Sequence, residues 1–208
     1  MLARVCVCVV GVILAFWAAP ATAGDVKVYP IGSYLDCNKT CAVALFAGPL
    51  LQINLTPEDS AHSTLVGGTL SRVLVEFGGD ATIEGEIGFA QRFGDMDERE
   101  VWAAATFRWK SFPWNRYLVT TLALSEGVDY ASDVASYEIT QSKVGHGARL
   151  LNYLAPELTL ALPAYPDWQL LFSVHHRSGG GILWRDHGPF DGVWGASQYF
   201  VMGVRHWF

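Results

Sequence analysis

The residues from Trp168 to Ser178, W-Q-L-L-F-S-V-H-H-R-S, decide the fold. Successive side chains of a β-strand point to opposite faces. One face would then carry Trp168, Leu170, Phe172, Val174, His176 and Ser178, and the opposite face Gln169, Leu171, Ser173, His175 and Arg177. The first face is apolar until its end, where a base and a nucleophile stand two residues apart, within hydrogen-bond reach of each other. The segment predicts a strand whose apolar face ends either in a candidate reactive pair or in ordinary polar residues that mark the rim of the membrane.

Seven other segments have strand character. The eight together span about 43–54, 64–77, 81–92, 99–110, 116–126, 148–162, 168–178 and 196–208. Apolar and polar residues alternate in several of them; in the third, Ala81, Ile83, Gly85, Ile87 and Phe89 oppose Thr82, Glu84, Glu86 and Gly88. A lipid-facing side and a polar lumen side generate this pattern. We expect Glu84 and Glu86 to meet Arg108 in a lumen salt-bridge network that fills a narrow barrel.

The composition agrees with a membrane protein built from strands. Of the 208 residues, 51% are hydrophobic and 13% aromatic. After residue 23 no uninterrupted apolar run has the length of a spanning helix, so a closed barrel is the expected membrane fold. A soluble lipocalin-like barrel, with its apolar face inward, is the alternative. The predicted fold class is all-β, an eight-stranded antiparallel transmembrane β-barrel.

The first 23 residues have the features of a signal peptide. Arg4 precedes an apolar run from Val5 to Ala19, and Ala21-Thr22-Ala23 fits a cleavage site. A retained membrane anchor is the alternative, but the run is short for a span. We therefore expect a signal peptide at 1–23 and the barrel at 24–208.

Two cysteines, Cys37 and Cys41, remain after cleavage at Ala23. An exported chain meets an oxidising compartment, so these two are predicted to form a disulfide. Two thiols without a histidine at ligand spacing do not indicate a metal site, and none is expected. Without Arg4, 13 basic side chains remain against 20 acidic ones, a net charge of −7. This balance argues against nucleic acid as a partner.

The connections fit an outer-membrane topology. With a periplasmic N-terminus, the segments at about 55–63, 127–147 and 179–195 become extracellular, and short turns, such as Gly78-Gly79-Asp80, become periplasmic. The last segment ends on Phe208. Its pattern resembles the C-terminal signal of bacterial outer-membrane proteins, with His206 at a position where an aliphatic or aromatic residue is usual.

The end of the chain resembles the lipid A 3-O-deacylase (PagL) family. The residues that carry the resemblance are His175 to Gly181, Asp191 to Gln198, and Gly203-Val204-Arg205 with the terminal aromatic. Ser125-Glu126-Gly127 and Leu150 to Leu154 look like a more distant acyloxyacyl-hydrolase-like branch of the same family. The resemblance is best over roughly the last 85 residues and weak before residue 116.

The resemblance implies hydrolysis of an ester-linked acyl chain on lipid A, the membrane anchor of lipopolysaccharide, without a cofactor. His176 matches the family's base and Ser178 its nucleophile. Gly179 stands where the family has asparagine, although the N–H groups of Gly179 and Gly180 could still hold an oxyanion.

The family's acid, a glutamate, falls on Gln198. An amide can orient the histidine but cannot stabilise its charged form. Asp191 and Asp186 in the outer loop are the alternative sources of a carboxylate.

Two functions follow. The first is an outer-membrane esterase of the lipid A deacylase type. The second is a non-catalytic outer-membrane barrel with a structural or surface-interaction role. Gln198 favours the second, and the retained His176 and Ser178 favour the first.

Overall fold

The structure, a computed structural model, describes residues 25–29, 37–51, 61–142, 145–180, 190, 193 and 196–208. These residues form nine strands and one short helix. They are β1 (Val26–Val28), β2 (Cys41–Pro49), β3 (Ser63–Phe77), β4 (Ala81–Gly94), β5 (Arg99–Trp109), β6 (Val119–Ala131), α1 (Ser136–Gln141), β7 (Leu150–Ala161), β8 (Trp168–Ser178) and β9 (Ala196–Trp207). The expected signal peptide lies outside the described residues.

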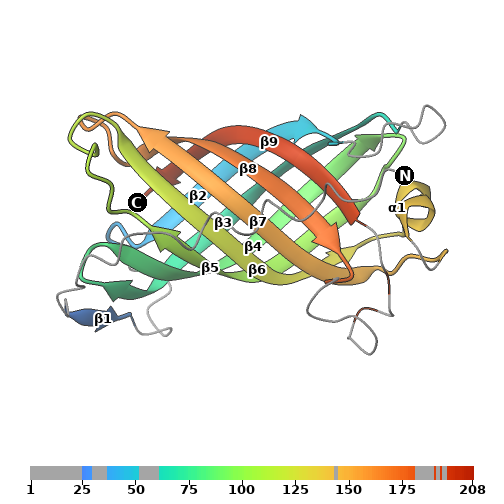
Figure 1. The fold of residues 1–208 in the computed structure, drawn as a ribbon, viewed down its shortest axis with the longest axis horizontal. Coiled ribbons are helices and arrows are strands. Elements are labelled where there is room, and N and C mark those ends of the chain that lie inside the picture. The colour runs from blue at the N-terminus through green and yellow to red at the C-terminus, as the bar shows by residue number, and fades with distance from the viewer. Residues whose placement is uncertain are drawn as a thin grey trace, which may run out of the picture.

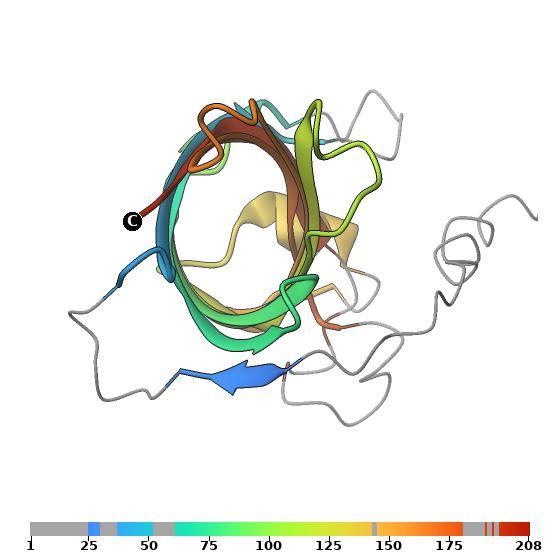
Figure 2. The same cartoon turned by 90° about the vertical axis from the view of Figure 1, so that its left-hand side faces the viewer.

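The strands β2 to β9 close into one antiparallel barrel, seen from the side in Figure 1 and along its axis in Figure 2. Each pairs with its neighbours in sequence, and β2 pairs with β9 from Ala42↔Trp207 to Ala47↔Met202. Closure leaves the wall without an unpaired edge, which a strand in hydrocarbon requires. The predicted eight-stranded antiparallel barrel is therefore confirmed.

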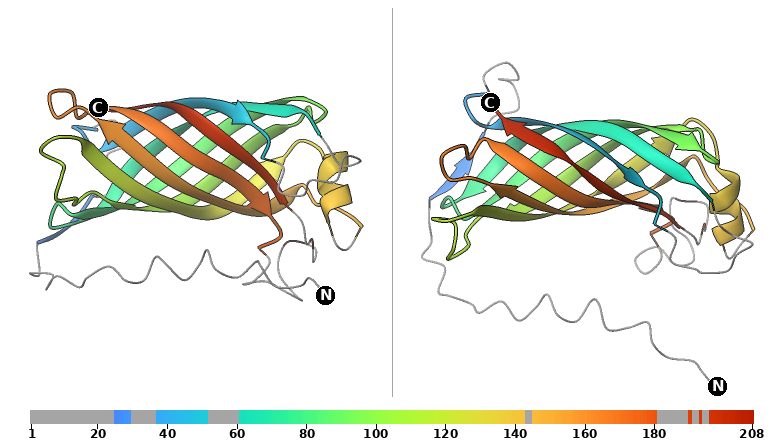
Figure 3. Two further views of the ribbon diagram at one scale, coloured as in Figure 1. Left: turned by 45° about the horizontal axis from the view of Figure 1, so that its top comes forward. Right: turned by 90° about the horizontal axis from the view of Figure 1, so that it is seen from above.

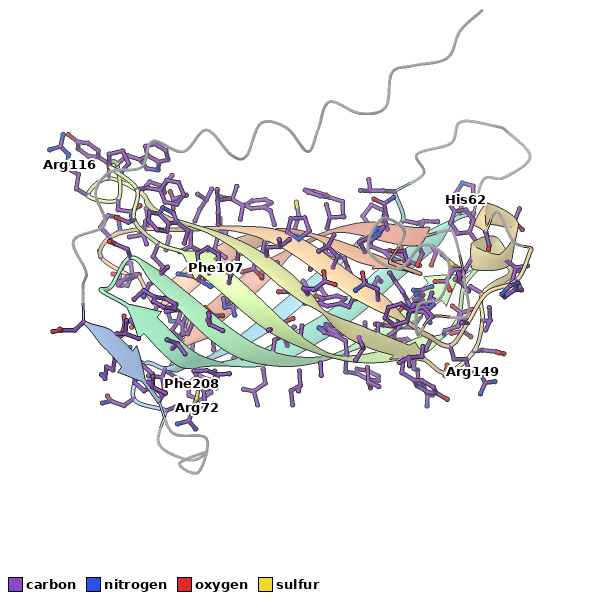
Figure 4. All side chains as sticks on the ribbon, turned by 60° about the horizontal axis from the view of Figure 1, so that its bottom comes forward. His62, Arg72, Phe107, Arg116, Arg149 and Phe208 are labelled. Carbon is purple, nitrogen blue, oxygen red and sulfur yellow. A yellow bond between two sulfur atoms is a disulfide. The ribbon has the colours of Figure 1, made fainter. Side chains whose placement is uncertain are left out.

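The outside of the barrel is apolar. Large side chains that are more than 45% exposed there include Leu45, Leu70, Ile87, Phe89, Phe107, Leu124, Leu170 and Met202. Figure 4 shows side chains projecting outward along the length of the wall. The lipocalin-like alternative is therefore wrong, because the apolar face points outward. A closed wall with an apolar exterior and a filled interior is the fold of an outer-membrane barrel. None of the described helices is both long enough and apolar enough to cross a bilayer.

Charged groups fill the lumen at the end where the short turns lie. Arg108 Nε donates to Glu84 Oε1 at 2.7 Å, and Glu157 Oε1 accepts at 2.7 Å from both Arg108 and Arg205. Arg205 also reaches Glu84 Oε2 at 3.1 Å. The predicted contact between Glu84 and Arg108 is confirmed. The one predicted for Glu86 is wrong: Glu86 accepts a hydrogen bond from Trp102 Nε1 at 3.0 Å, because Trp102 fills the middle of the lumen.

The helix α1 covers the other mouth of the barrel, and Figure 2 shows it beyond the ring of strands. Its Glu138 is 2% exposed and bonds to Arg92, Arg177 and Ser197. Burial would raise the pKa of Glu138, but the two guanidinium groups outweigh burial and hold the pKa below its usual range. The helix replaces part of the expected extracellular loop at 127–147.

The two ends of the barrel differ as an outer-membrane topology requires. The C-terminus and the turns lie at one end and α1 lies at the other (Figure 3). Gly78 and Gly79 take φ values of +55° and +84° in the turn between β3 and β4, a region that favours glycine. We call the end with α1 the loop end; in outer-membrane barrels the end with the longer loops is extracellular.

Two strands have bounds that differ from expectation by several residues, and one strand was not expected at all. The strand predicted at 116–126 runs from Val119 to Ala131, because Trp114 and Asn115 bond to Thr120 and lengthen the preceding turn, while Asp129 continues the lumen face. The strand predicted at 43–54 ends at Pro49. The strand β1, which pairs with β3 at Val26↔Phe77, was not expected.

Cys37 and Cys41 are joined by a disulfide where β2 begins. Cys41 pairs with Arg72 in the first register position between β2 and β3. The bridge therefore ties the segment before β2 to the end of the barrel wall where the turns lie.

The closed apolar wall predicts that the mature chain fractionates with the outer membrane and runs faster on gels unless boiled, because a barrel resists detergent unfolding. Fractionation and electrophoresis with and without heating measure this. A water-soluble periplasmic monomer would contradict it.

The disulfide predicts that purified mature protein has no reactive thiol until it is reduced. Thiol labelling with and without reductant measures this, and stoichiometric labelling without reductant rejects the bridge. Because only three residues separate the cysteines, cross-linking entropy adds little to global stability. The double Cys37→Ser, Cys41→Ser variant should therefore still fold.

Candidate functional site

The last four residues of β8 put polar side chains on both faces of the strand. His175 and Arg177 point into the lumen and are 1% and 0% exposed. His176 and Ser178 have the opposite parity and are half-buried on the lipid-facing side, at the loop end. The alternation read from the sequence therefore describes β8 correctly.

The two lipid-facing side chains contact each other. His176 Nε2 lies 3.0 Å from Ser178 Oγ, within hydrogen-bond distance. This is the geometry in which an imidazole can take the proton of a hydroxyl as that hydroxyl attacks. The partner strand holds the pair in register, with His176 opposite Gln198 and Ser178 opposite Ala196.

Two glycines follow the serine. The Gly180 N–H donates to Ser178 Oγ at 3.2 Å, so this donor faces the hydroxyl. Gly180 has a φ of +74°, which favours glycine. A Cβ on Gly179 would lie 1.7 Å from the carbonyl oxygen of Val193, so the returning chain passes directly over it. Both glycines are therefore required by the local backbone, whatever their chemical role.

The third member of a triad has no bonded carboxylate in the described structure. Gln198 stands opposite His176, and its backbone carbonyl accepts a hydrogen bond from Leu51 at 2.7 Å. In the described part of the chain, Ser178 is the one side chain that hydrogen-bonds the His176 ring. Asp186 and Asp191 lie outside the described residues.

Two further polar residues extend the site across the wall. Asn152 stands directly opposite Ser178 on β7, and its Nδ2 donates to Glu126 Oε1 and to the Gly127 carbonyl. Glu126 lies on the exposed, lipid-facing side of β6. Glu126 and His176 both pair with Leu154, so the three residues lie side by side across β6, β7 and β8.

The sequence contained the signal for these two residues. Glu126 alternates with Leu124 and Val128, so parity alone puts its carboxylate on the lipid-facing side. The stretches Ser125-Glu126-Gly127 and Leu150 to Leu154 carry the family resemblance but predict no role for Glu126 or Asn152. The register that places Asn152 opposite Ser178 can be read only from the folded sheet.

Five lipid-facing polar side chains thus adjoin one another on four neighbouring strands. They are Glu126 on β6, Asn152 on β7, His176 and Ser178 on β8, and Gln198 on β9. The exterior around this group, which we call the polar row, is apolar, with Leu124, Leu150, Val174 and Phe200 as neighbours along the same strands. A charge on the lipid face costs up to about 2–4 kcal/mol near the bilayer midplane and less toward its surface. Polar residues are ordinary at the rim of the bilayer, as the outward-facing Gln91 and Arg99 at the same end show. The feature that indicates a function is therefore the contact between His176 and Ser178, a base and a nucleophile.

Comparison with known proteins gives the fold and no closer assignment. No family model matches the sequence, and no curated protein matches it. Among solved structures, the outer membrane enzyme PagL superposes with a TM-score of 0.51 at 13% identity, over 80% of this chain and 99% of PagL. Neisserial surface protein A (NspA) superposes with a TM-score of 0.50 at 13% identity, over 82% of this chain and 97% of NspA. The Yersinia pestis outer membrane protein Ail superposes with a TM-score of 0.43 at 17% identity, over 81% of this chain and 98% of Ail. An enzyme and a surface protein share the fold, so only the residues of the site can indicate the function.

Proposed function

We propose that the chain is an outer-membrane esterase that removes an ester-linked acyl chain from lipid A, with Ser178 as nucleophile and His176 as base. The observation that carries the proposal is the 3.0 Å contact between His176 Nε2 and Ser178 Oγ on the lipid-facing side of the wall. A catalytic pair in this position serves a substrate that lies in the membrane. Lipid A in the outer leaflet presents its acyl esters at the extracellular side of the hydrocarbon, where the loop end of the barrel lies.

The reaction needs two acyl transfers. Ser178 Oγ attacks the ester carbonyl while His176 Nε2 takes the hydroxyl proton, and a tetrahedral oxyanion forms. Collapse breaks the bond to the sugar oxygen, which leaves with the proton from His176 as the free alcohol. Water then attacks the acyl-serine with the same base, releasing the fatty acid and restoring Ser178. We assign the oxyanion to the backbone N–H groups of Gly179 and Gly180; before the attack the Gly180 N–H donates to Ser178 Oγ at 3.2 Å, so it lies next to the reacting atom.

The remaining members of the polar row position the reacting groups. Gln198 stands opposite His176 and can accept from the other ring nitrogen, which fixes the tautomer. Glu126 anchors the amide of Asn152 beside Ser178 and is the one carboxylate in the row. We assign Asn152 and Glu126 to holding the polar part of the substrate next to the ester.

The second candidate is a non-catalytic barrel with a surface-interaction role. The observation that favours it is the amide at position 198, because an amide leaves a developing imidazolium without a compensating charge. This candidate explains the paired His176 and Ser178 less well, since a binding surface does not require a base in contact with a nucleophile.

Removing either reacting group should abolish lipid A deacylation and leave the barrel folded. Ser178→Ala and His176→Ala should each lower lipid A deacylation at least about 100-fold, the lower end of what a general base contributes. The double variant should be no worse than either single one, because the two act as a unit. Mass spectrometry of lipid A from cells carrying each variant measures this.

Matched controls lie on the same strands. Ser173→Ala removes a serine of β8 with the other parity, and His206→Ala removes a lipid-facing histidine that stacks on Trp168 at the opposite end of the barrel. Both should keep wild-type deacylation. Unmodified lipid A in the presence of folded wild-type protein would refute the esterase and favour the second candidate.

Restoring a carboxylate tests the role of position 198. Gln198→Glu should raise the deacylation rate, because a carboxylate opposite His176 stabilises the imidazolium, whereas Gln198→Leu should lower it. Initial rates on lipid A in detergent micelles measure both. If Gln198→Glu leaves the rate unchanged and Asp186→Asn or Asp191→Asn lowers it, the orienting carboxylate comes from the outer loop instead.

A further inference from the structure

Among the described residues, the loop half of the lumen contains more buried negative charge than positive charge. Four carboxylates lie there beside two guanidinium groups: Glu98, Glu100, Asp129 and Glu138 beside Arg92 and Arg177, each less than a tenth exposed. Counted as ionised, with neutral histidine, the six groups carry a net charge of −2. The network at the turn end is balanced, because Glu84 and Glu157 face Arg108 and Arg205. Glu86 lies between the two networks and accepts a hydrogen bond from Trp102 Nε1.

An uncompensated charge in such a place is costly. Taking an ion out of water costs several kcal/mol unless partners replace its hydration. Asp129 uses one oxygen for Arg177 Nε at 2.7 Å, and its other oxygen, Oδ2, is buried and has no hydrogen-bond partner among the described residues. In the same described part of the chain, the buried His175 Nδ1 has no partner either. These unfilled positions belong to residues that are 0% and 1% exposed.

Asp129 and His175 lie beside a third possible ligand, Glu100. Glu100, Asp129 and His175 each offer a ligand atom, and these atoms lie within 4.8 Å of one another. His175 Nε2 and Glu100 Oε2 are 2.8 Å apart, a hydrogen-bond distance, whereas two ligands of a tetrahedral ion bound at about 2.1 Å lie roughly 3.4 Å apart. The ion would therefore take the place of the proton between these two atoms and move them slightly apart. The rings of Trp102 and Tyr153 pack on His175 at 4.9 and 5.1 Å between centroids and hold its orientation.

We infer that Glu100, Asp129 and His175 bind one divalent transition-metal ion inside the barrel. One imidazole and two carboxylates suit Zn²⁺ and its first-row neighbours, whereas Ca²⁺ and Mg²⁺ prefer oxygen ligands alone. A charge of +2 offsets the excess of the network. The ion joins β5, β6 and β8 on the lumen side of the wall, next to the residue before His176. The proposed site does not depend on the proposed esterase activity.

The test uses mature, tag-free protein extracted in detergent, since a histidine tag would bind the probe. After treatment with chelator and dialysis, calorimetric titration with Zn²⁺ should show one equivalent bound per chain. His175→Ala and Asp129→Asn should lose this equivalent, and His62→Ala, which removes an exposed histidine at the same end, should keep it. Equal binding by wild type and His175→Ala would overturn the inference.

Measurements on the wild type decide the matter should the lumen variants fail to fold. The melting temperature of chelated protein should rise on adding Zn²⁺ and level off at one equivalent. X-ray absorption of the bound zinc should show only nitrogen and oxygen ligands near 2.0–2.1 Å. No shift in melting temperature and no stoichiometric binding would overturn the site.

Discussion

The whole structure depends on one constraint: in hydrocarbon, every backbone N–H and C=O of the wall must find its partner within the protein. The ladder between β2 and β9 meets it by closing the sheet on itself. Once closed, the sheet has only two surfaces, and alternation assigns each residue to one of them. The apolar rows then face lipid, and the polar rows must satisfy one another inside, which explains why four arginines are fully buried yet paired with carboxylates.

The same constraint gives meaning to the polar row. Inside the barrel, polar residues compensate one another, so their presence implies no function. On the lipid-facing side five of them adjoin one another on four strands at the loop end. A hydroxyl and an imidazole in contact among them are most simply explained by a substrate that lies in the membrane beside the barrel. The superposed barrels include an enzyme and a surface protein, so this local chemistry, and not the fold, supports the proposed esterase.

Much of this could be predicted from the sequence, because strand alternation is a local property. The strand at 168–178 and the parity of His175 and His176 follow from a period of two. Register between strands is not local: Glu86 meets Trp102 instead of Arg108, and no local pattern places Asn152 opposite Ser178. The helix α1 and the short strand β1 were missed because each is stabilised by distant partners, Arg92 and Arg177 for Glu138 and the edge of β3 for β1. Convergence of Glu100, Asp129 and His175 from three strands has no sequence motif either.

The central claim is that Ser178 is an activated nucleophile reached from the lipid. A fluorophosphonate with a long alkyl chain, which partitions into the bilayer and reacts only with activated hydroxyls, tests it most directly in outer-membrane vesicles. Intact-mass and peptide mass spectrometry should find one adduct, on Ser178, and none in the His176→Ala variant. An unlabelled wild-type barrel, or an adduct that persists on Ser178 without His176, would contradict the account.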